Sequence, residues 1–378
     1  MTPTFKRSTL RAAFLFAFAV SVSVPSESRK PPSGQLEIHY INVGQGGSTL
    51  IVGPNGTTIL FDFGQVAGKQ NIIPYLRSEF GMKFGDAIQY AIVSHGDKDH
   101  YFGYQDFVDA GFNVLVANYE PGTKKAVTAM MNTKWFEPAK TTKAGAFKSI
   151  PVGLRISLGN GAEAIVMAAN GVVFGENKSP KIKNENDRSI SLFVRHGNFR
   201  YIIDGDLGAG AEACTQHDTS QIDVQTRVAQ ALIDNEFMTE YGGVDVLHIA
   251  HHGSESSTSA AYFNMMRPKV GLISVGRNQG TFLHPREDVV DRILLDGGKI
   301  PRAECVTAPP LKALFQTEEG TPGCSSTGCT SFRGMAVGDI KLVTDGIAGY
   351  TITVSHRVHG TPKNKATSQA KWEFKLDE

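Results

Sequence analysis

Four side chains that can bind a metal ion lie within six residues of one stretch of the sequence. His95, Asp97, Asp99 and His100 belong to the segment SHGDKDH, which begins at the end of a mostly apolar strand expected at 88–94. Histidine nitrogens and carboxylate oxygens are ligands that zinc, manganese and iron accept. A tight loop after a strand can aim several side chains at one point, so this segment predicts part of a metal site. On its own, the segment would also suit a polar loop.

Two further segments end in the same kinds of side chain. They are Asp204 and Asp206 after residues 201–203, and His251 and His252 after residues 246–250. Open α/β sheets place their sites at the carboxyl ends of strands, so we expect three ligand-bearing strand ends to meet at one edge. Two metals at such an edge are a recurring hydrolytic device, in which a metal-bound hydroxide attacks and the leaving oxygen is stabilised.

The elements that would position these residues alternate between strands and helices. Strands are expected at 36–41, 48–52, 57–63, 88–94, 114–117, 165–167, 189–195, 199–203, 244–249 and 270–275, and helices at 70–80, 102–110, 225–239, 258–266 and 286–296. The turn signal Pro54-Asn55-Gly56 joins the second and third strands as a hairpin. Strands separated by helices, with hairpins at the start, predict a layered α/β domain.

The composition is that of an ordinary globular protein. The 378 residues are 41% hydrophobic and 20% charged, and 38 Lys and Arg against 37 Asp and Glu give a formal net charge of +1. This balance excludes a global attraction to nucleic acid or to an anionic membrane. A local basic groove remains compatible with it.

The first thirty residues are typical of a secretory signal peptide. Lys6, Arg7 and Arg11 precede the uncharged apolar run 12–24, which is shorter than the roughly 20 residues needed to span a bilayer. We therefore expect a secreted or periplasmic protein with no stable membrane span after the signal is removed. An uncleaved anchor and a start codon assigned too early are the alternatives.

The cysteine pattern fits export and argues against a cysteine-rich zinc site. No CxxC pair occurs among Cys214, Cys305, Cys324 and Cys329. In an exported protein these residues favour a disulfide, and the sequence does not indicate which two pair. Four free thiols are the alternative.

The segment SHGDKDH resembles the metallo-β-lactamase signature HxHxDH, with Asp97 where the second histidine usually stands. This variant resembles the hydrolase domain of the ComEC-type competence proteins and their stand-alone relatives. Further stretches carry the resemblance, in order, across residues 36–354: INVGQGGSTLIV, TTILFDFG, NDRSISLFVRHGNFRYIIDGDL, HIAHHGS and GDIKLVTDGIAGYTI. The resemblance implies an α/β fold of four layers, the αββα sandwich, over residues 35–356. Additions are expected near 208–242 and 308–334, and a polar C-terminal tail at 357–378.

The resemblance also implies roles for the residues of the metal loop. His95 and Asp97 would bind one divalent metal, zinc or manganese. Asp99 and His100 would bind a second such metal, and Asp206 would bridge the two. Asp99 is also a candidate to orient the attacking water.

One of the two adjacent histidines is expected to complete the ligand set. We expect His251 to be this ligand, because it comes first after the strand. His252 would then contact a substrate phosphate or act as a general acid. A hydrogen-bonded supporting histidine is the alternative role for His252.

Other residues are expected around the ligands. Asp62 matches an aspartate that supports the metal loop from behind, and Asp204 is expected to be a supporting carboxylate. His284 belongs to an His-Pro element that is expected at the rim of the site. Lys98 could contact a phosphate, although a solvated side chain is the favoured interpretation.

The sequence departs from the family pattern at two places. The usual third-motif histidine is absent, and Asn186 or Asp187 in its place is expected to be a weak ligand or a partner of one. Gly47 stands where the family has a carboxylate. The chain also has no hydrophobic segments like those that surround the ComEC domain, so the resemblance extends to the chemistry and not to DNA uptake.

The function expected from these residues is a metal-dependent phosphodiesterase or nuclease. Asp97 makes the site richer in oxygen, which favours manganese or mixed metals and a phosphate substrate. A lactonase or β-lactamase-like ester or amide hydrolase is the second hypothesis. A non-catalytic metal-binding protein is the third. The expected partner is a phosphodiester or other small ester-like substrate, with nucleic acid as one candidate, and the oligomeric state is left open.

Overall fold

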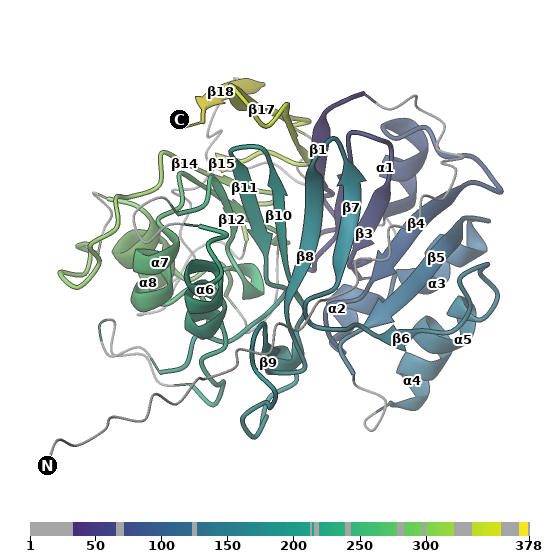
Figure 1. Cartoon of the computed structure of the whole chain (residues 1–378), viewed down its shortest axis with the longest axis horizontal. Helices are drawn as coiled ribbons and strands as arrows, with labels where there is room; N and C mark the ends of the chain where they lie inside the picture. Colours follow the sequence, from purple (N-terminus) through teal and green to yellow (C-terminus); the bar gives the residue numbers. More distant parts are fainter. Residues whose placement is uncertain are drawn as a thin grey trace, which may run out of the picture.

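The computed structural model of the chain describes residues 33–65, 72–122, 127–211, 214, 219–238, 243–277, 283–296, 300–320, 335–356 and 370–376. Figure 1 shows two β-sheets side by side, with helices on the outer side of each sheet. The predicted signal peptide at 1–30, as well as Cys324 and Cys329, lies outside the described residues. In the described part of the chain, no helix is long and apolar enough to cross a membrane.

The first sheet has the strand order β18-β17-β16-β1-β2-β3-β4-β5-β6. Its strands are β1 (Leu36–Tyr40), β2 (Thr49–Val52), β3 (Thr58–Phe61), β4 (Ala87–Ile92), β5 (Asn113–Glu120), β6 (Lys148–Ser149), β16 (Ile340–Thr344), β17 (Gly349–Val354) and β18 (Lys371–Lys375). β1, β2 and β3 pair antiparallel, whereas β3 to β6 run parallel. The helical elements on this side are α1 (Ile72–Ser78), α2 (Lys98–Tyr101), α3 (Tyr104–Asp109), α4 (Ala129–Met131), η1 (Asn132–Phe136) and α5 (Glu137–Ala139).

The second sheet has the strand order β15-β14-β13-β12-β11-β10-β8-β7, with β9 paired to β8. Its strands are β7 (Arg155–Gly159), β8 (Ala162–Ala169), β9 (Val172–Val173), β10 (Ser191–His196), β11 (Phe199–Ile203), β12 (Val246–His248), β13 (Val270–Ile273), β14 (Ala313–Gln316) and β15 (Met335–Ala336). The strands from β11 to β15 run parallel. The helical elements on this side are η2 (Asn186–Arg188), α6 (Gln225–Asp234), η3 (His251–Gly253), α7 (Ala260–Met266), α8 (Glu287–Val289) and η4 (Val290–Leu294).

Three hydrophobic layers hold the sheets and helices together. Successive strand residues point to opposite faces, so Ile59 and Phe61 of β3 enter the core between the sheets, whereas Leu60 enters the core beneath the helices. On the second sheet, Ile202 packs under the helices and Tyr201 packs between the sheets. Each such side chain contributes roughly 1.5–3 kcal/mol by leaving water. Two facing sheets between two helical layers are the predicted αββα sandwich, so the predicted fold class is confirmed.

In the first sheet, β3 and β4 run parallel, so their carboxyl ends lie at the same edge. In the second sheet, β11 and β12 run parallel, so their carboxyl ends also lie together. The ligand-bearing segments that follow are Asp62, His95–His100, Asp206 and His251–His252. Each sheet therefore contributes part of one site.

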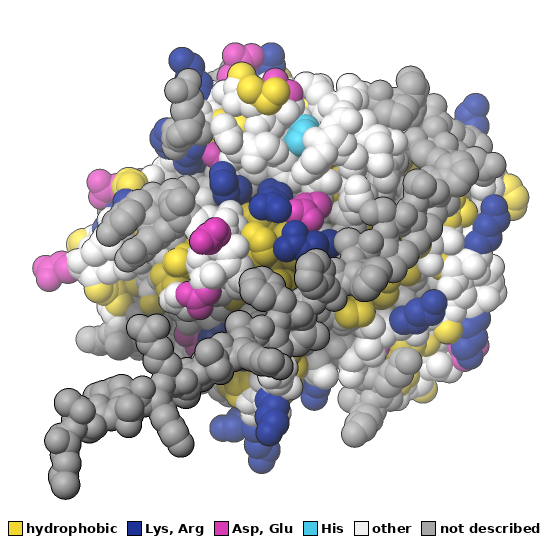
Figure 2. All heavy atoms as spheres, viewed as in Figure 1, with side chains coloured by type: hydrophobic (Ala, Val, Ile, Leu, Met, Phe, Trp, Pro, Cys, Tyr) yellow, Lys and Arg dark blue, Asp and Glu magenta, His cyan; other side chains and the backbone are white. Residues whose placement is uncertain are grey.

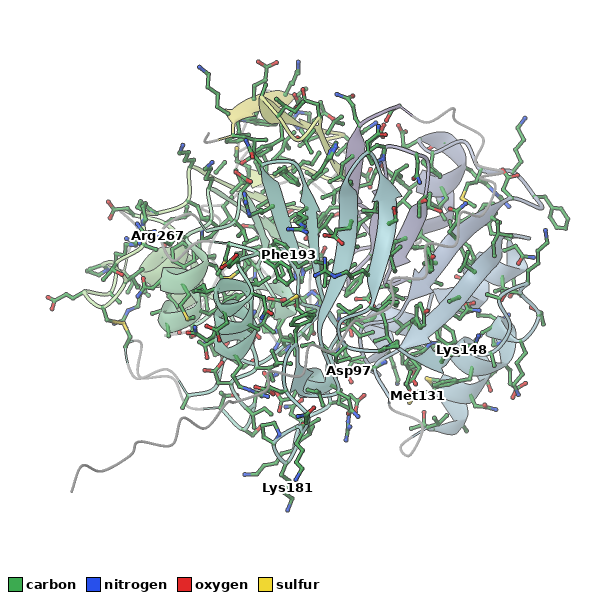
Figure 3. The ribbon with its side chains drawn as sticks, viewed as in Figure 1. Asp97, Met131, Lys148, Lys181, Phe193 and Arg267 are labelled. Atoms are coloured by element: carbon green, nitrogen blue, oxygen red, sulfur yellow. A yellow bond between two sulfur atoms is a disulfide. The ribbon has the colours of Figure 1, made fainter. Side chains whose placement is uncertain are left out.

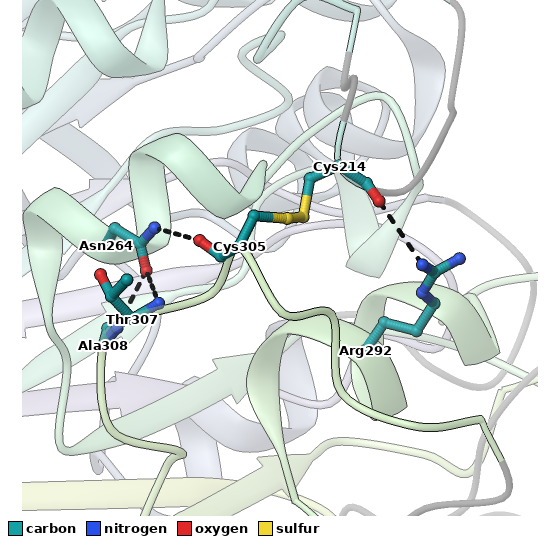
Figure 4. The surroundings of a disulfide bond; sticks show 6 residues. All are labelled: Cys214, Asn264, Arg292, Cys305, Thr307 and Ala308. Carbon is teal, nitrogen blue, oxygen red and sulfur yellow. Dashed lines mark hydrogen bonds between the residues drawn. A yellow bond between two sulfur atoms is a disulfide. The ribbon is translucent and has the colours of Figure 1, made fainter.

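One disulfide joins two segments of the second half of the chain. Cys214 pairs with Cys305 at a Cα–Cα distance of 6.1 Å, which is typical of a disulfide. Figure 4 shows Asn264 of α7 beside this bond, where its amide donates to the Cys305 carbonyl at 2.9 Å. The expected disulfide is therefore present, and the partner that the sequence left open is Cys305.

The last described segment adds a strand to the first sheet. Within the predicted polar tail at 357–378, Lys371–Lys375 form β18, which pairs antiparallel with β17. Trp372 and Phe374 of this strand pack against the core between the sheets, and Trp372 meets Phe315 edge to face at 4.8 Å between ring centroids. This segment is therefore polar on one face only.

Candidate metal centre

The metal loop lies at the carboxyl end of β4 and continues into α2. Asp97 is the residue before this helix, in extended conformation. The glycine-rich loop 44–47 packs directly on the metal loop, since Gly47 N donates to Asp99 O at 3.1 Å. Gly46 adopts φ 126°, and a Cβ there would collide with the Asp99 carbonyl oxygen. Glycine at position 46 is therefore required for the two loops to approach this closely.

Asp62 supports two histidines of the metal loop from behind. Its Oδ2 accepts hydrogen bonds from His100 Nδ1 at 2.7 Å and from Ser94 Oγ at 2.8 Å. Ser94 Oγ also lies 3.0 Å from His95 Nδ1. These contacts fix both imidazole rings with their Nε2 atoms facing away from Asp62 and towards the site. Gly47 borders the same pair, because a Cβ at this position would lie 3.2 Å from both Asp62 Oδ2 and His100 Nδ1.

One carboxylate oxygen lies at the centre of the site. Asp206 Oδ2 is 3.4 Å from the Nε2 atom of His100, 3.6 Å from that of His252, 3.8 Å from that of His95 and 3.9 Å from that of His251. The Nε2 atoms of three of these residues, His95, His100 and His252, are buried and have no hydrogen-bond partner. A buried polar atom without a partner costs about 1–3 kcal/mol, so these nitrogens indicate a missing binding partner such as a metal ion.

The possible ligands divide into two overlapping groups. His95, His100 and Asp206 form one, and Asp99, His100 and His252 form the other, with all ligand atoms of a group within 4.8 Å of one another. The predicted ligand Asp97 lies beside the first group, with its Oδ2 3.5 Å from His95 Nε2. Every ligand atom is a histidine nitrogen or a carboxylate oxygen, a donor set that zinc and manganese accept.

The two adjacent histidines lie at different places in the site. We expected His251 to be the ligand and His252 to act on the substrate, but the compact group with Asp99 contains His252, whose Nε2 is 3.2 Å from Asp99 Oδ2. His252 Nδ1 donates to the Ser274 carbonyl at 2.7 Å, which leaves Nε2 free to bind a metal. His252 is therefore a candidate ligand in addition to the expected His251.

The backbone after β12 explains how both rings reach Asp206. His251, His252 and Gly253 adopt positive φ values of 51°, 54° and 81°. Left-handed conformation costs a residue other than glycine roughly 1–2 kcal/mol, and it persists where surrounding contacts enforce it. Here His251 N donates to Gly205 O at 3.2 Å, which ties this turn to the strand end that carries Asp206.

The carboxylates and imidazoles of the site stabilise each other's charged forms. Burial alone would raise the pKa of Asp206, but the neighbouring His100, His252 and His251 hold it well below its usual range. Burial would lower the pKa of His100, but the carboxylates of Asp206 and Asp62 raise it well above its usual value. Against the effect of burial, neighbouring histidines also lower the pKa of Asp99 and Asp97, so these carboxylates are ionised and can bind a cation.

The segment that replaces the usual third-motif histidine contributes three different contacts. Asn186 Nδ2 lies 3.3 Å from His251 Nε2. Asp187 is directed away from the ligands, since its Oδ2 accepts from Ile222 N at 3.2 Å, and burial raises its pKa to about 6. Glu185, which was not among the expected site residues, accepts a hydrogen bond from Gly96 N at 3.1 Å. Only its position beside Asn186 could have drawn attention to it.

Asp204 connects the elements behind the site. Its carboxylate is fully buried and accepts hydrogen bonds from Ser191 Oγ at 2.6 Å, Tyr262 Oη at 2.6 Å and Gln225 Nε2 at 3.1 Å. These donors lie on β10, α7 and α6, so Asp204 links the strand end that carries Asp206 to the outer helices.

His284 lies next to the two adjacent histidines. Its ring centroid is 5.4 Å from that of His251 and 6.3 Å from that of His252. Burial, followed by the nearby histidines His251 and His252, lowers the pKa of His284 to about 2. A neutral imidazole therefore borders this side of the site.

Comparison with known proteins agrees with this architecture. No protein-family model matches the chain. Over 263 residues the chain is 26% identical to Recombination protein 2 of Haemophilus influenzae, covering 68% of this chain and 26% of that protein. Over 279 residues it is 24% identical to ComE operon protein 3 of Bacillus subtilis, covering 68% of this chain and 30% of that protein. The chain thus spans between a quarter and a third of the length of these curated relatives.

Among solved structures, the metallo-β-lactamase fold protein YhfI from Bacillus subtilis aligns with a TM-score of 0.35 and 10% identity, covering 63% of this chain and 85% of that one. The fold assignment depends on the sheets and layers described above and not on this low score. The two sheets, their outer helices and the ligand-bearing edge form the metallo-β-lactamase fold that the resemblance implied. The sequence matches, at 24% and 26% identity, are a similarity to these two proteins and agree with the resemblance that the sequence motifs indicated.

Proposed function

We propose that the chain is a two-metal phosphodiesterase that accepts nucleic acid as a substrate. The observation that supports this most directly is the position of Asp206 Oδ2, between 3.4 and 3.9 Å from the Nε2 atoms of four histidines. A single carboxylate among that many imidazoles suits a ligand shared between two cations. Two divalent cations bound there would lower the pKa of a water and neutralise charge on the attacking and leaving oxygens.

We infer a particular division of the ligands, which adds Asp97 and His251 to the two compact groups. His95, Asp97 and His251 would hold one cation, and Asp99, His100 and His252 the other, with Asp206 shared. In this arrangement His251 would take the place of the missing third-motif histidine, with its Nε2 exchanging the contact to Asn186 for the cation. His251 and His252 would each serve one cation.

The remaining residues orient these ligands. Asp62 would hold the ring of His100, and the Ser274 carbonyl would hold the ring of His252. Asp99 has 20% of its side chain exposed, so its carboxylate can accept a hydrogen bond from a water at the site as well as contact His252. This supports the expectation that Asp99 orients the attacking water.

The oxygen content of the site favours phosphodiesters over lactams. Asp97 replaces a histidine, so the first cation would have two carboxylates and two imidazoles as ligands. Harder, oxygen-rich sites favour manganese or mixed metals, which commonly act on phosphates. A lactonase or β-lactamase-like activity remains the second hypothesis, and a non-catalytic metal-binding protein the third.

Activity and metal content together test the proposal. Protein loaded with manganese or zinc is expected to cleave bis-p-nitrophenyl phosphate and plasmid DNA, to lose this activity with a chelator, and to leave nitrocefin intact. Asp99→Ala should reduce phosphodiester hydrolysis by more than about 100-fold, since it removes a ligand. Asp109→Ala, an exposed change of the same type on α3, should have no effect. Cleavage of nitrocefin with both phosphodiesters untouched would refute the phosphodiesterase and favour the second hypothesis.

Metal stoichiometry tests the ligand division separately. The wild type is expected to bind about two metals per chain. His251→Ala and His252→Ala should each retain about one. Two metals in the His251→Ala protein would show that this residue is not a ligand, and absence of metal from the wild type would support a site of another kind.

We also propose that the protein is exported. The pattern of residues 1–30 and the disulfide between Cys214 and Cys305 support this, because disulfides persist in oxidising compartments. Fractionation of cells that express the full chain is expected to place it in the periplasm or the medium. Recovery of the protein in the cytoplasm with both thiols reduced would contradict export.

A further inference from the structure

A loop beside the metal centre carries three exposed lysines. Lys178, Lys181 and Lys183 lie in residues 177–183, which we call the lysine loop, and all three are exposed. None of them forms an ion pair with a carboxylate in the described part of the chain. Figure 3 shows Lys181 projecting from the body of the protein on the same side as Asp97, and Figure 2 shows Lys and Arg side chains at this margin.

Two anchors fix the lysine loop at the edge of the site. At its far end, Glu185 accepts from Gly96 N in the metal loop, and Asn186 contacts His251. Lys183 is two residues from Glu185, so the chain separates their Cα atoms by at most about 7 Å. In the middle, Ser179 and Ile182 fold back on the turn at Gly171, where a Cβ would lie 2.9 Å from Ile182 Cδ1.

The acidic residues at both ends of the loop are already neutralised. Glu176 forms an ion pair with Arg227 of α6, and Glu185 pairs with Arg188 at 3.2 Å. The segment between them contains no acidic residue. Because Ile182 is held against the protein, Lys181 and Lys183 are left on the solvent side of the loop. The result is a local positive surface in a chain whose formal net charge is only +1.

We propose that the lysine loop binds successive phosphates of an extended phosphodiester strand and guides that strand to the metal centre. This inference rests on the proposed function, because it extends the same site beyond the bond that is cleaved. Flexible ammonium groups bind phosphates as point charges without reading bases. The loop would therefore increase affinity for polymers over small diesters, without sequence preference.

Binding of a hydrolysis-resistant strand tests the inference without depending on turnover. The probe is a fluorescently labelled phosphorothioate oligodeoxynucleotide of about 15 nucleotides. Its fluorescence anisotropy is measured while the full protein is added, at several salt concentrations. The variant Lys178→Gln/Lys181→Gln/Lys183→Gln should bind about 10- to 100-fold more weakly at 0.1 M salt. Its slope of log affinity against log salt should fall by about 2, since each lost contact with a single strand removes about 0.7.

A matched control carries the same loss of charge at the opposite edge of the sheets. Lys83, Lys312 and Lys375 are exposed and lie near the amino ends of β4 and β14 and beside Gly349. The corresponding triple glutamine variant should bind the oligonucleotide like the wild type. Equal losses in both variants would overturn the inference, as would unchanged binding by the lysine-loop variant.

Two further measurements separate this inference from the proposed function. In the lysine-loop variant, kcat/KM for bis-p-nitrophenyl phosphate should fall much less than the affinity for the oligonucleotide, because this diester carries one phosphate and the loop binds several. If the wild type cleaves no phosphodiester, the proposed function fails while the binding result still decides the role of the loop. Binding of the loop to phosphatidylglycerol vesicles, with no binding of the oligonucleotide, would assign it to a lipid surface and overturn the inference.

Discussion

Asp62 connects the centre of the first sheet to the proposed metal ligands. It adopts a positive φ of 62°, and its two carboxylate oxygens accept hydrogen bonds from Ser94 N, Ser94 Oγ and His100 Nδ1. One side chain thus holds the strand end that carries His95 and the ring of His100. A supporting carboxylate of this kind affects metal affinity without touching the metal.

At the residue scale, Asp62→Asn is expected to weaken metal binding by about 10- to 100-fold. The amide keeps the size of the side chain but offers one acceptor where three donors converge. Competition with a chelating dye measures the affinity, and Asp109→Asn provides a control with the same change at an exposed position. Equal affinity in Asp62→Asn and the wild type would show that Ser94 alone is sufficient to hold the rings.

The candidate ligands were predictable from the sequence, because histidines and aspartates cluster directly after apolar strands. The supporting role of Asp62 came from the resemblance and not from spacing. Glu185 was not predictable, because its contact with Gly96 joins residues 89 positions apart. The placement of His251 and His252 depends on three consecutive left-handed residues, which no pattern of hydrophobicity indicates.

At the element scale, β1 and β16 are joined by a charged contact on the outer face of the first sheet. Glu37 lies 3.2 Å from His39 Nε2 and 2.6 Å from Lys341 Nζ. The hydrogen bond from His39 is the largest influence on the pKa of Glu37, and with Lys341 it outweighs burial and lowers that pKa to about 2. The ionised carboxylate therefore stabilises the pairing of these two strands.

The lowered pKa of Glu37 predicts a pH-dependent contribution to stability. A depressed carboxyl pKa stabilises the fold above the unfolded value near 4.5, and this contribution is lost as the pH falls towards 2. Glu37→Gln should lower the free energy of unfolding by about 2 kcal/mol at pH 7 and by roughly half as much or less at pH 3. Urea unfolding at both pH values measures the difference. The exposed Glu373→Gln serves as a control, and a loss for Glu37→Gln that does not depend on pH would contradict the electrostatic origin.

Most of the central elements were predictable, because alternating or continuous apolar runs mark β1 to β4, β10 and β11. The edge strand of the first sheet was harder to predict from the sequence. In β18 only Trp372 and Phe374 are apolar, so the composition indicated a polar tail although the two-residue period of a strand is present. The element η1 contains the buried Trp135, and no periodicity in the sequence predicted a helix there.

At the scale of the whole molecule, the disulfide between Cys214 and Cys305 connects segments 91 residues apart. A disulfide restricts the unfolded chain and typically raises the free energy of unfolding by about 2–4 kcal/mol. Cys214→Ser/Cys305→Ser should therefore unfold at a lower temperature than the wild type while retaining metal. Thermal unfolding with and without a reducing agent measures this, and the variant should not respond to the reducing agent. Identical unfolding of both proteins would show that this bond does not stabilise the fold.

The proposed ligands come from both halves of the sandwich. His95, Asp97, Asp99 and His100 follow a strand of the first sheet, whereas Asp206, His251 and His252 follow strands of the second. Cations bound to both sets would act as cross-links between the sheets, in addition to the apolar core. Their binding free energy would then add to the free energy of folding, so that the supply of metal in the surroundings would govern the lifetime of the protein as well as its activity.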